Sequence, residues 1–439
     1  MHGPGDVNAA EMWSLMEALY PIPRALCGPG FLASLECIGR RLPIEITRFP
    51  SGEKVFDWVI PKEFKVNEAW VKDASGKVVI DFRDCHYHVW NYSQSFDGIL
   101  ELEELRENVA TLPHLPHAVP FRPTYYREKW GLAASEDLMQ SLPRGRYQVH
   151  IDTELKDGFL RIGECHLPGE SDEEILIGSY LCHPLGANDN LSGVAVAVEL
   201  FRMLSALPKR RYSYRLALWP ETIGAVTYIA RHPDRLKKTI GGYLIQCCGD
   251  EGPLHYKASY GGRSLVDRAY LHALAHSGLP HKVMPYNHHH TGSDACQFNA
   301  IGVRIPFGSA MRSPPNRYPQ YHSSADDLAY VRPGALLESL RVAWEAVQAI
   351  EKAVHYRGKF TVDPFLSGHG IYPYDQGAGE GKLGGPIAIA YYELMGGIDG
   401  ETDLLAIADR AGIPIGAFDR PVRDFLRKGL MEPAEVPAH

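Results

Sequence analysis

The feature that most constrains the fold is an alternation of short apolar runs with amphipathic helical segments in the second half of the chain. The apolar runs are too short for helices and are typical of buried strands. They are residues 175–180, 214–219, 242–247 and 303–306. The helical segments between and after them are residues 191–201, 265–277 and 333–353. Alternation of this kind predicts an α/β fold whose mostly parallel sheet has helices on both faces.

The rest of the chain predicts two additions to this α/β domain. Residues 47–83 contain short alternating apolar runs separated by turn residues, and residues 84–145 are rich in aromatic residues and prolines. After a glycine-rich linker at 377–385, short helical patterns are joined by glycine turns, as in helix-turn-helix and winged-helix domains. The predicted domains are residues 1–45 and 150–357 for the α/β domain, 46–149 for a β-rich, aromatic-rich lid, and 358–439 for a winged-helix-like domain.

Charge and cysteine content exclude several classes of function. The 439 residues carry a net charge of -8, so no basic field is available to attract nucleic acid or an anionic membrane. The cysteines are scattered without a Cys-x-x-Cys pair, which disfavours a cysteine zinc site. No run reaches the ~18 apolar residues of a membrane span, and the first residues show no secretory pattern. We therefore expect a cytoplasmic protein with reduced thiols and with no membrane or nucleic-acid partner.

The first candidate site is the loop of residues 182–193, directly after the apolar run 175–180. Ligands of open α/β sheets bind at the carboxyl ends of strands, so His183 and Asp189 on this loop can point at one spot. Imidazole and carboxylate groups are ordinary zinc ligands. The alternative is that Asp189 only caps the helix that follows, and this loop alone does not decide between the two.

Two further segments carry candidate residues. The segment Pro220-Glu221 directly follows the apolar run 214–219, which puts Glu221 at the same edge of the predicted sheet. A glutamate beside a zinc site can accept a proton from water and return it to a leaving amine, although an acid at a helix start is often stabilised by the helix dipole alone. His322, in the loop before the last long helix, is the third possible ligand. A single histidine is more often structural, but the three segments together favour a metal site.

The order of these motifs resembles the co-catalytic zinc aminopeptidases, which have a phosphorylase-like α/β fold. The shared order is His183, then Asp189-Asn190-x-Ser192-Gly193, then Glu221 after a strand, then Tyr321-His322-Ser323-x-x-Asp326. Further segments resemble a less characterised family of unknown function with an aminopeptidase-like domain, an inserted β-rich unit and a winged-helix-like C-terminus. These segments are residues 88–93, 125–131, 182–184, 220–224 and 312–313. The resemblance extends over nearly the whole chain and implies a zinc-dependent hydrolase.

Three departures from the aminopeptidase pattern bear on the metal. Typical members have two adjacent acids after the strand, but here Thr222 follows Glu221. They also have a ligand aspartate near the position of Gln246, and an acid after the first histidine where this chain has Leu185. The ligands specific to a second zinc ion are therefore missing. The ligands that the resemblance retains are those of one zinc ion: His183, Asp189 and His322.

The substrate contacts that a second metal would supply must come from other side chains. Asp250, the acid nearest to the missing aspartate, and Tyr126 in the aromatic segment are candidates for binding substrate. Arg312 can bind a substrate carboxylate in bidentate fashion, although a structural salt bridge is the more common role for such an arginine.

The leading hypothesis is an aminopeptidase-like hydrolase of a small peptide or amide, with one zinc ion and Glu221 as general base. The lost ligands favour a different class, a binding or scaffold protein with a degenerate peptidase fold. A deacylase or amidohydrolase of a biosynthetic pathway shares the chemistry and differs only in its substrate. The extra terminal domain makes a homo-oligomer a further expectation. The three histidines of residues 288–290 lie in a polar stretch and are interpreted as a solvated loop rather than a metal site.

Overall fold

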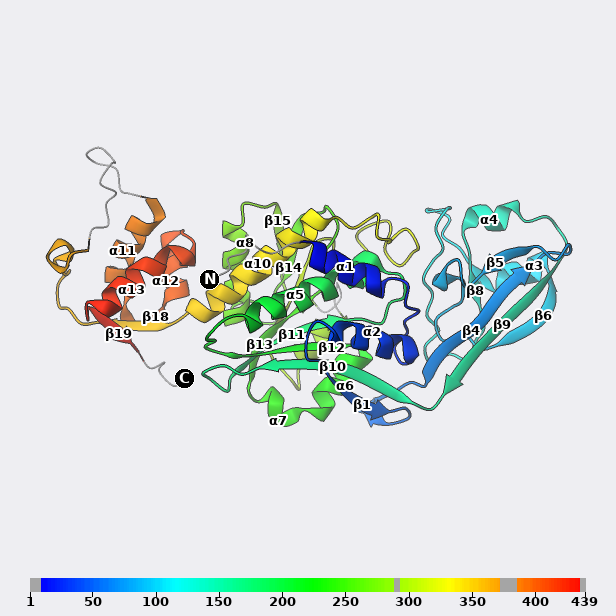
Figure 1. Cartoon of the computed structure of the whole chain (residues 1–439), viewed down its shortest axis with the longest axis horizontal. Helices are drawn as coiled ribbons and strands as arrows, with labels where there is room; N and C mark the ends of the chain where they lie inside the picture. The colour runs from blue at the N-terminus through cyan, green and yellow to red at the C-terminus, as the bar shows by residue number, and fades with distance from the viewer. Residues whose placement is uncertain (1–8, 288–292, 372–384, 435–439) are drawn as a thin grey trace. The chain divides into compact units, whose positions relative to one another are not determined.

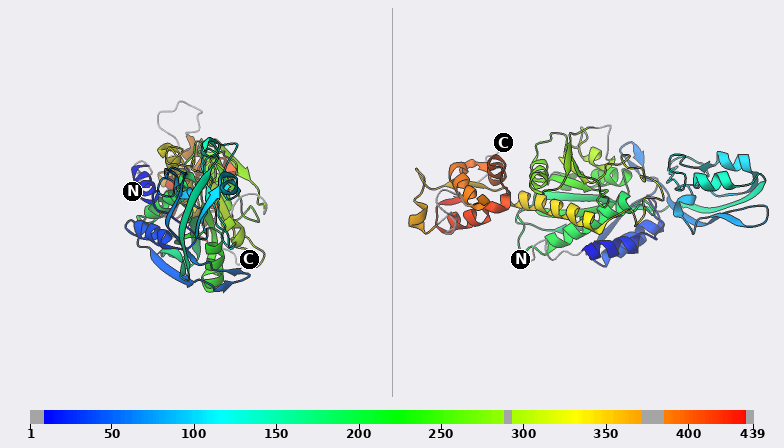
Figure 2. Two further views of the ribbon diagram at one scale, coloured as in Figure 1. Left: turned by 90° about the vertical axis from the view of Figure 1, so that its right-hand side faces the viewer. Right: turned by 90° about the horizontal axis from the view of Figure 1, so that it is seen from above.

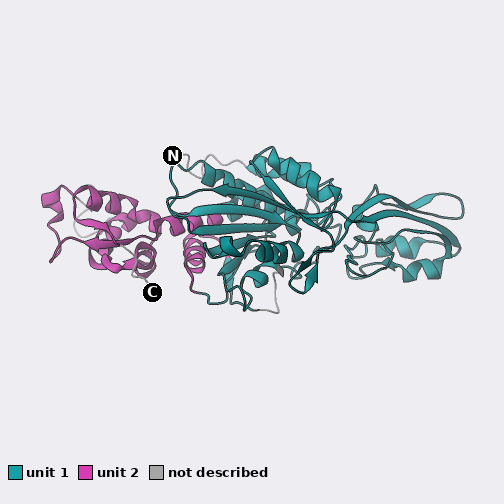
Figure 3. Cartoon of the chain, turned by 90° about the horizontal axis from the view of Figure 1, so that it is seen from below, with its two compact units in different colours: residues 1–262, 281–341 teal, residues 263–280, 342–439 magenta. Residues whose placement is uncertain are grey.

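The computed structural model describes residues 9–287, 293–371 and 385–434. The histidine tract at 288–290 and nearly all of the predicted linker at 377–385 lie outside these residues. The chain forms two compact units, and each is described by itself. Unit 1 comprises residues 1–262 and 281–341, and unit 2 comprises residues 263–280 and 342–439 (Figure 3). The domain boundaries predicted at residues 46, 149 and 358 stay predictions.

An eight-stranded sheet forms the centre of unit 1 (Figure 1). In spatial order its strands are β1 (Glu45–Pro50), β10 (Phe159–Leu167), β12 (Ser213–Trp219), β11 (Glu174–Tyr180), β13 (Thr239–Ile245), β16 (Phe307–Met311), β14 (Leu254–Lys257) and β15 (His281–Met284). The four strands at its centre, β12, β11, β13 and β16, are parallel. All seven residues of β11 are buried, because helices cover both faces of the sheet. The predicted α/β fold with a mostly parallel sheet is confirmed.

One predicted strand of this sheet is wrong. Residues 303–306 form a turn and an irregular segment, and β16 begins only at Phe307. Arg304 has a φ of 54°, outside the strand region, and Pro306 has no N–H to donate to a neighbouring strand. The apolar pattern identified the correct part of the chain, but strand pairing begins only after Pro306.

Helices lie on both faces of the sheet (Figure 2). The helices that pack with one another are α1 (Ala9–Leu19), α2 (Pro29–Gly39) and α5 (Gly193–Ser205) in one group, and α6 (Ile223–Arg231) and α9 (Ser293–Phe298) in another. Residues 193–201 of α5 are buried without exception, and all of them except Glu199 are apolar or glycine. The remaining helices near the sheet are α7 (Pro233–Leu236) and α10 (Pro333–Lys352), which begins in unit 1 and ends in unit 2.

The chain segment between β1 and β10, which are neighbours in the large sheet, forms a smaller antiparallel sheet. Its strands, in spatial order, are β5 (Val78–Asp81), β4 (Glu63–Lys72), β9 (Arg146–Lys156) and β6 (Phe96–Glu101). The other elements of the inserted segment are β2 (Lys54–Val55), β3 (Trp58–Val59), α3 (Leu102–Glu107), β7 (Val109–Ala110), β8 (Leu132–Ala133) and α4 (Glu136–Ser141). Val71, Val149 and Leu105 are among the residues of a separate buried cluster here, so this inserted β-sheet has its own hydrophobic core.

Unit 2 combines helix α8 (Leu265–His276) with the C-terminal part of the chain. The other elements are β17 (His355–Gly358), α11 (Gly385–Gly397), β18 (Asp399–Asp403), α12 (Leu404–Ala411), α13 (Asp419–Arg427) and β19 (Met431–Pro433). Asp403 accepts hydrogen bonds from both Nη atoms of Arg268, at 2.8 and 2.6 Å. His272 Nδ1 lies 2.6 Å from Asp409 Oδ1, and its Nε2 accepts the N–H of Ile415. Among the described helices, none has the length and apolarity that crossing a membrane requires.

Gly178 in β11 is the position at which strand packing leaves no space for a side chain. A Cβ atom there would lie 2.5 Å from Cη2 of Trp219 on the neighbouring strand β12. We expect Gly178→Ala to lower the free energy of unfolding by about 1–3 kcal/mol, the usual cost of overpacking a core. Gly302→Ala is the matched control, because a Cβ there meets nothing within 4 Å. Denaturant unfolding of both variants checks this, and equal stability of the two would contradict it.

Candidate metal centre and catalytic site

Three side chains from distant parts of the chain meet at the carboxyl end of the parallel strands. His183 comes shortly after β11, Asp189 lies in the short helical turn Ala187–Ser192, and His322 lies in the loop before α10. One ligand atom from each lies within 4.8 Å of the other two. They form the one group of this kind found among the described residues. The side chains of His183 and Asp189 are only 2% exposed, while that of His322 is 32% exposed, so the cluster is open on the His322 side.

The atoms that face one another in this cluster have no hydrogen-bond partners among the described residues. They are Nε2 of His183, Oδ2 of Asp189 and Nε2 of His322, and all three are buried. His322 Nε2 lies 3.2 Å from Asp189 Oδ2, but this contact does not have the alignment of a hydrogen bond. Buried polar atoms are almost always hydrogen-bonded. Three convergent atoms without such bonds, all of types that bind zinc, therefore fit a metal ion.

The protonation states of these groups also suit a metal. Burial lowers the pKa of His183, even though the charges of Asp189 and Glu221 oppose that change. Burial alone would raise the pKa of Asp189, but the two imidazoles and the Tyr180 hydroxyl outweigh it and lower that pKa to about 2. A neutral imidazole and an ionised carboxylate are the forms that bind metal ions.

Two sets of contacts fix the orientation of Asp189. Its Oδ1 accepts a hydrogen bond from the Tyr180 hydroxyl at 2.5 Å, and Cys247 Sγ lies 3.8 Å from the same atom. The carboxylate of Asp326 accepts the backbone N–H of Asn188 at 2.6 Å and that of Asp189 at 2.9 Å. Burial is the main reason that the pKa of Asp326 is raised to about 7, against the effect of these N–H bonds. Asp189 Oδ2 is thereby left to face the two histidines.

Glu221 lies beside the cluster, directly after β12. Its Oε2 is 3.6 Å from Nε2 of His183, and its side chain is 26% exposed. The backbone turns sharply at Thr222, which has a φ of 60° and donates its N–H to Asp294 at 2.6 Å. This turn at the start of α6 keeps the carboxylate of Glu221 at the strand end, next to His183 and within reach of water.

The two positions at which ligands of a second zinc ion are missing, Thr222 and Gln246, offer no carboxylate. Thr222 uses its N–H in the turn, and the side chain of Gln246 is 1% exposed. Nε2 of Gln246 is buried and has no hydrogen-bond partner among the described residues. An amide nitrogen does not bind zinc, so these positions add nothing to the ligand set of His183, Asp189 and His322.

Two of the residues predicted to bind substrate, Asp250 and Arg312, use their polar atoms in hydrogen bonds within the protein. Asp250 is 1% exposed, and its oxygens accept hydrogen bonds from Asn188, Gly252 and both donors of Ser313. Arg312 is 7% exposed and donates to the carbonyl groups of Gly252 and Ala335 and to Glu338. These contacts favour structural roles for both side chains.

Tyr126, the third residue predicted to bind substrate, is 53% exposed and donates its hydroxyl to the Val59 carbonyl at 2.8 Å. Its neighbour Tyr125 is the one that is close to the site. Burial raises the pKa of Tyr125, and the charges of Cys182, Glu221 and Asp189 act in the same direction. The sequence does not distinguish the two tyrosines, because a φ of 47° at Tyr125 reverses the direction of the backbone there.

Arg24 is a buried residue behind the site that sequence reasoning missed. It is 2% exposed, donates through Nε to the carbonyl of His183 at 2.9 Å, and also contacts the Leu19 carbonyl. Burial lowers its pKa to about 10, so it stays charged at neutral pH. A single arginine in a proline-rich stretch carries no sequence signal for such a role. It supports the backbone of the first ligand.

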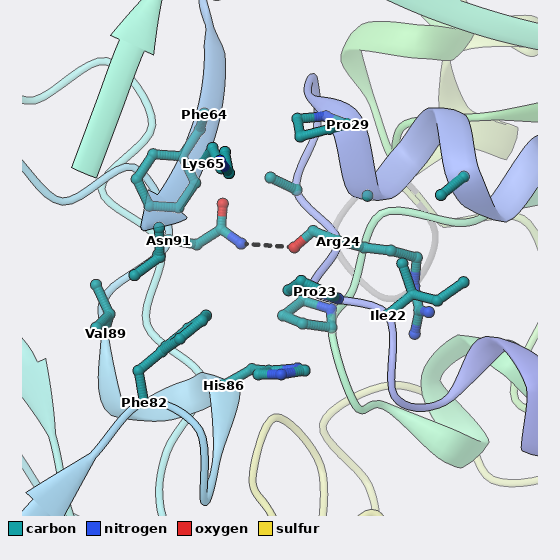
Figure 4. A pocket seen from close by; sticks show the side chains of 15 residues that line it. Ile22, Pro23, Arg24, Pro29, Phe64, Lys65, Phe82, His86, Val89 and Asn91 are labelled. Atoms are coloured by element: carbon teal, nitrogen blue, oxygen red, sulfur yellow. Dashed lines mark hydrogen bonds between the residues drawn. The ribbon is translucent and has the colours of Figure 1, made fainter. Parts of the chain in front are cut away.

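Two cavities adjoin the site. One, of about 280 Å³, lies behind the His183 loop between the N-terminal segment and the inserted β-sheet (Figure 4). There, Asn91 Nδ2 donates to the Arg24 carbonyl at 3.2 Å, and none of the three candidate ligands lines the space. The other, a cleft of about 720 Å³, is lined by His322, Tyr321 and Phe121. The Phe121 ring contacts both histidines, at 5.2 Å between ring centroids, so this cleft is the open side of the cluster.

A family model described as "Domain of unknown function (DUF4910)" matches residues 13–353. A Clostridium acetobutylicum protein, provisionally named as a polysaccharide biosynthesis protein with an aminopeptidase-like domain, is 35% identical over 416 residues, which span 92% of both chains.

The same fold occurs in solved structures. A crystal structure of a provisionally named peptidase from Clostridium acetobutylicum has a TM-score of 0.90 and 33% identity, covering 97% of this chain and 96% of that one. BSAP, a zinc aminopeptidase from Bacillus subtilis, has a TM-score of 0.55 and 14% identity, covering 77% of this chain and 94% of that one. The resemblance that the motifs indicated is confirmed for the family and the fold.

Asp326 holds the Asp189 loop and should control metal affinity without touching the metal. We expect Asp326→Ala to leave two buried N–H groups unpaired and to weaken Zn²⁺ binding about 10–100-fold, the usual effect of losing a partner that orients a ligand. Asp327→Ala is the matched control, because Asp327 accepts only the N–H of Tyr330 among the described residues. Competition of each protein with a chromogenic chelator measures the affinity. Equal affinities for the two variants would refute the role of Asp326.

Proposed function

The chain belongs to the family described as a domain of unknown function (DUF4910), and from this premise we propose that it is a zinc-dependent hydrolase of amide or peptide bonds. The observation that carries the proposal is the convergence of three buried, unpaired ligand atoms, from His183, Asp189 and His322. Its fold is aminopeptidase-like, and a zinc aminopeptidase is among the proteins that share it. Fold alone does not determine activity, so the proposal rests on the site.

The side chains divide into those that would hold the metal and those that would move protons. His183, Asp189 and His322 would hold one zinc ion, which when bound polarises a carbonyl group and lowers the pKa of a water molecule to about 7. Glu221, next to His183 and reached by solvent, would accept a proton from water and return it to the leaving nitrogen. Tyr180 keeps Oδ1 of Asp189 occupied, so that Oδ2 faces the two histidines.

We propose a single zinc ion because the positions of a second ligand set hold Thr222 and Gln246. Three protein ligands with an open position are the usual arrangement of a catalytic zinc site. The exposure of His322 supports access of substrate to the site from the cleft. The same substitutions favour a second candidate function, a binding protein that keeps the fold without the activity.

The name of one relative bears on the substrate. The Clostridium acetobutylicum protein is provisionally named for polysaccharide biosynthesis, which favours a deacylase of that kind of pathway over a peptidase. Deacylation of an amide uses the same zinc ligands and the same general base. We propose no nucleic-acid or membrane partner. The winged-helix-like assignment of residues 358–439, a homo-oligomer and a cytoplasmic location remain proposals.

Metal content tests the ligand set. Purified protein is expected to contain about one zinc ion per chain after dialysis, because three protein ligands define one ion. Asp189→Ala is expected to contain almost none, whereas Glu221→Gln should keep the wild-type content because Glu221 is not a ligand. Elemental analysis measures the metal, and circular dichroism checks that the variants are folded. A wild-type protein that binds no zinc, or two ions per chain, would contradict the assignment.

Turnover tests the role of Glu221. We expect Glu221→Gln to retain zinc and to lose about 10²–10⁴-fold in kcat, the usual contribution of a general base. Glu251→Gln is the matched control, because its side chain is 77% exposed and pairs only with Arg332 among the described residues. The measurement is hydrolysis of chromogenic amides with and without a chelator. Full activity of Glu221→Gln would assign proton transfer to another group.

A further inference from the structure

The cleft that opens onto His322 carries positive charge and no acid. Its basic lining residues are Arg122, Arg317 and His114, and no aspartate or glutamate is among the residues that line it. The protein as a whole has a net charge of -8, so the charge of the cleft is opposite to that of the molecule. Walls of one charge concentrate ligands of the other.

The two arginines are exposed and have no side-chain partner among the described residues. Neither guanidinium group of Arg122 or Arg317 has an ion pair or a hydrogen bond within the part of the chain that the structure describes. By contrast, the buried Arg161 of the same unit is paired with Glu63 at 2.6 Å. Both cleft arginines lie in exposed positions, so their charge costs little in the free protein and is available to a ligand.

Both arginines are attached to the segments that form the candidate metal centre. Arg122 directly follows Phe121, whose N–H donates to the carbonyl of His322 at 2.8 Å. Arg317 precedes His322 in the same loop, next to Tyr318, whose hydroxyl contacts Asp326 at 3.3 Å. The backbone at both arginines is therefore anchored next to the loop of His322, and the two side chains share one cleft with His322.

We propose that Arg122 and Arg317 bind an anionic group of the substrate, a carboxylate or a phosphate, while the amide to be cleaved lies at the zinc site. This inference rests on the proposed function and adds the substrate class to it. A guanidinium group matches both anions in bidentate fashion. A substrate with a free ammonium group would meet two positive charges and no acid in this cleft. The expected substrate is therefore an acidic acyl amide rather than the amino terminus of a peptide.

Anion binding tests the arginines without any need for turnover. Titration calorimetry of the zinc-loaded, full-length protein with succinate and with inorganic phosphate should show binding of at least one of them, and which one binds identifies the anion. Arg122→Gln and Arg317→Gln should each weaken this binding about tenfold or more, as expected for loss of a charged hydrogen bond. Arg48→Gln is the matched control, because Arg48 on β1 is exposed and does not line the cleft.

The outcomes separate the arginines from the metal as the source of binding. Weaker binding in the two cleft variants at unchanged zinc content supports the proposal. Binding that is the same in these variants as in Arg48→Gln overturns it, because the anion would then bind the metal or another surface. If neither anion binds at ~10 mM, the proposal is also overturned. A Kd above ~10 mM would mean an affinity weaker than that of a weak specific site.

Hydrolysis assays separate this inference from the proposed function. An acyl anilide with a terminal carboxylate should have a kcat/KM about tenfold or more above that of its neutral carboxamide analogue, and a phosphate-bearing analogue tests the other anion. The double variant Arg122→Gln, Arg317→Gln should remove this preference, so that the acidic and neutral analogues have similar kcat/KM values, whereas Arg48→Gln should keep it. Equal rates for the acidic and neutral amides would contradict the inference. Absence of all turnover would contradict the proposed function, and the binding data would still decide on the anion site.

Discussion

The candidate site depends on one buried interaction, between the carboxylate of Asp326 and two backbone N–H groups. Asp326 accepts the N–H of Asn188 at 2.6 Å and that of Asp189 at 2.9 Å. Because Asp326 follows His322 in the same loop, these bonds join the loop of one ligand to the loop of another. An unpaired buried N–H costs about 1–3 kcal/mol, so the two loops cannot separate without a considerable loss of stability. The third ligand, His183, is placed by the end of β11 at the centre of the parallel sheet.

The inserted β-sheet region also contributes to the site. The N–H of Phe121 binds the carbonyl of His322 at 2.8 Å, and Val119 and Ser324 exchange two hydrogen bonds, at 2.9 and 2.8 Å. The Phe121 ring lies against both candidate histidines, and Arg122 follows it. A segment that pairs with the ligand loop in this way forms one wall of the cleft. Substrate selection can therefore reside in the insertion while the ligands stay on the α/β sheet.

Parallel-strand geometry is the reason that the sequence could place His183 and Glu221 together. His183 and Glu221 follow neighbouring strands, whose carboxyl ends share one edge of the sheet. Residues in irregular loops are different, since no periodicity determines where their side chains point. Tyr125 rather than Tyr126 is close to the site, because of a positive φ that no pattern reveals. The role of Arg24 could not be predicted for a related reason. Its hydrogen-bond partner, the His183 carbonyl, is 159 residues away in the chain.

Charge balance connects the missing acids with the unpaired arginines. A single divalent ion held beside the carboxylates of Asp189 and Glu221 would make a centre that is close to neutral. In such a centre the sign of the field in the cleft is decided by the surrounding side chains, and these include Arg122 and Arg317 but no acid. An acid at the position of Thr222 would have supplied negative charge for a second ion or for a substrate ammonium group. Its absence and the two arginines would change the preference of the proposed site in the same direction, toward an acidic substrate.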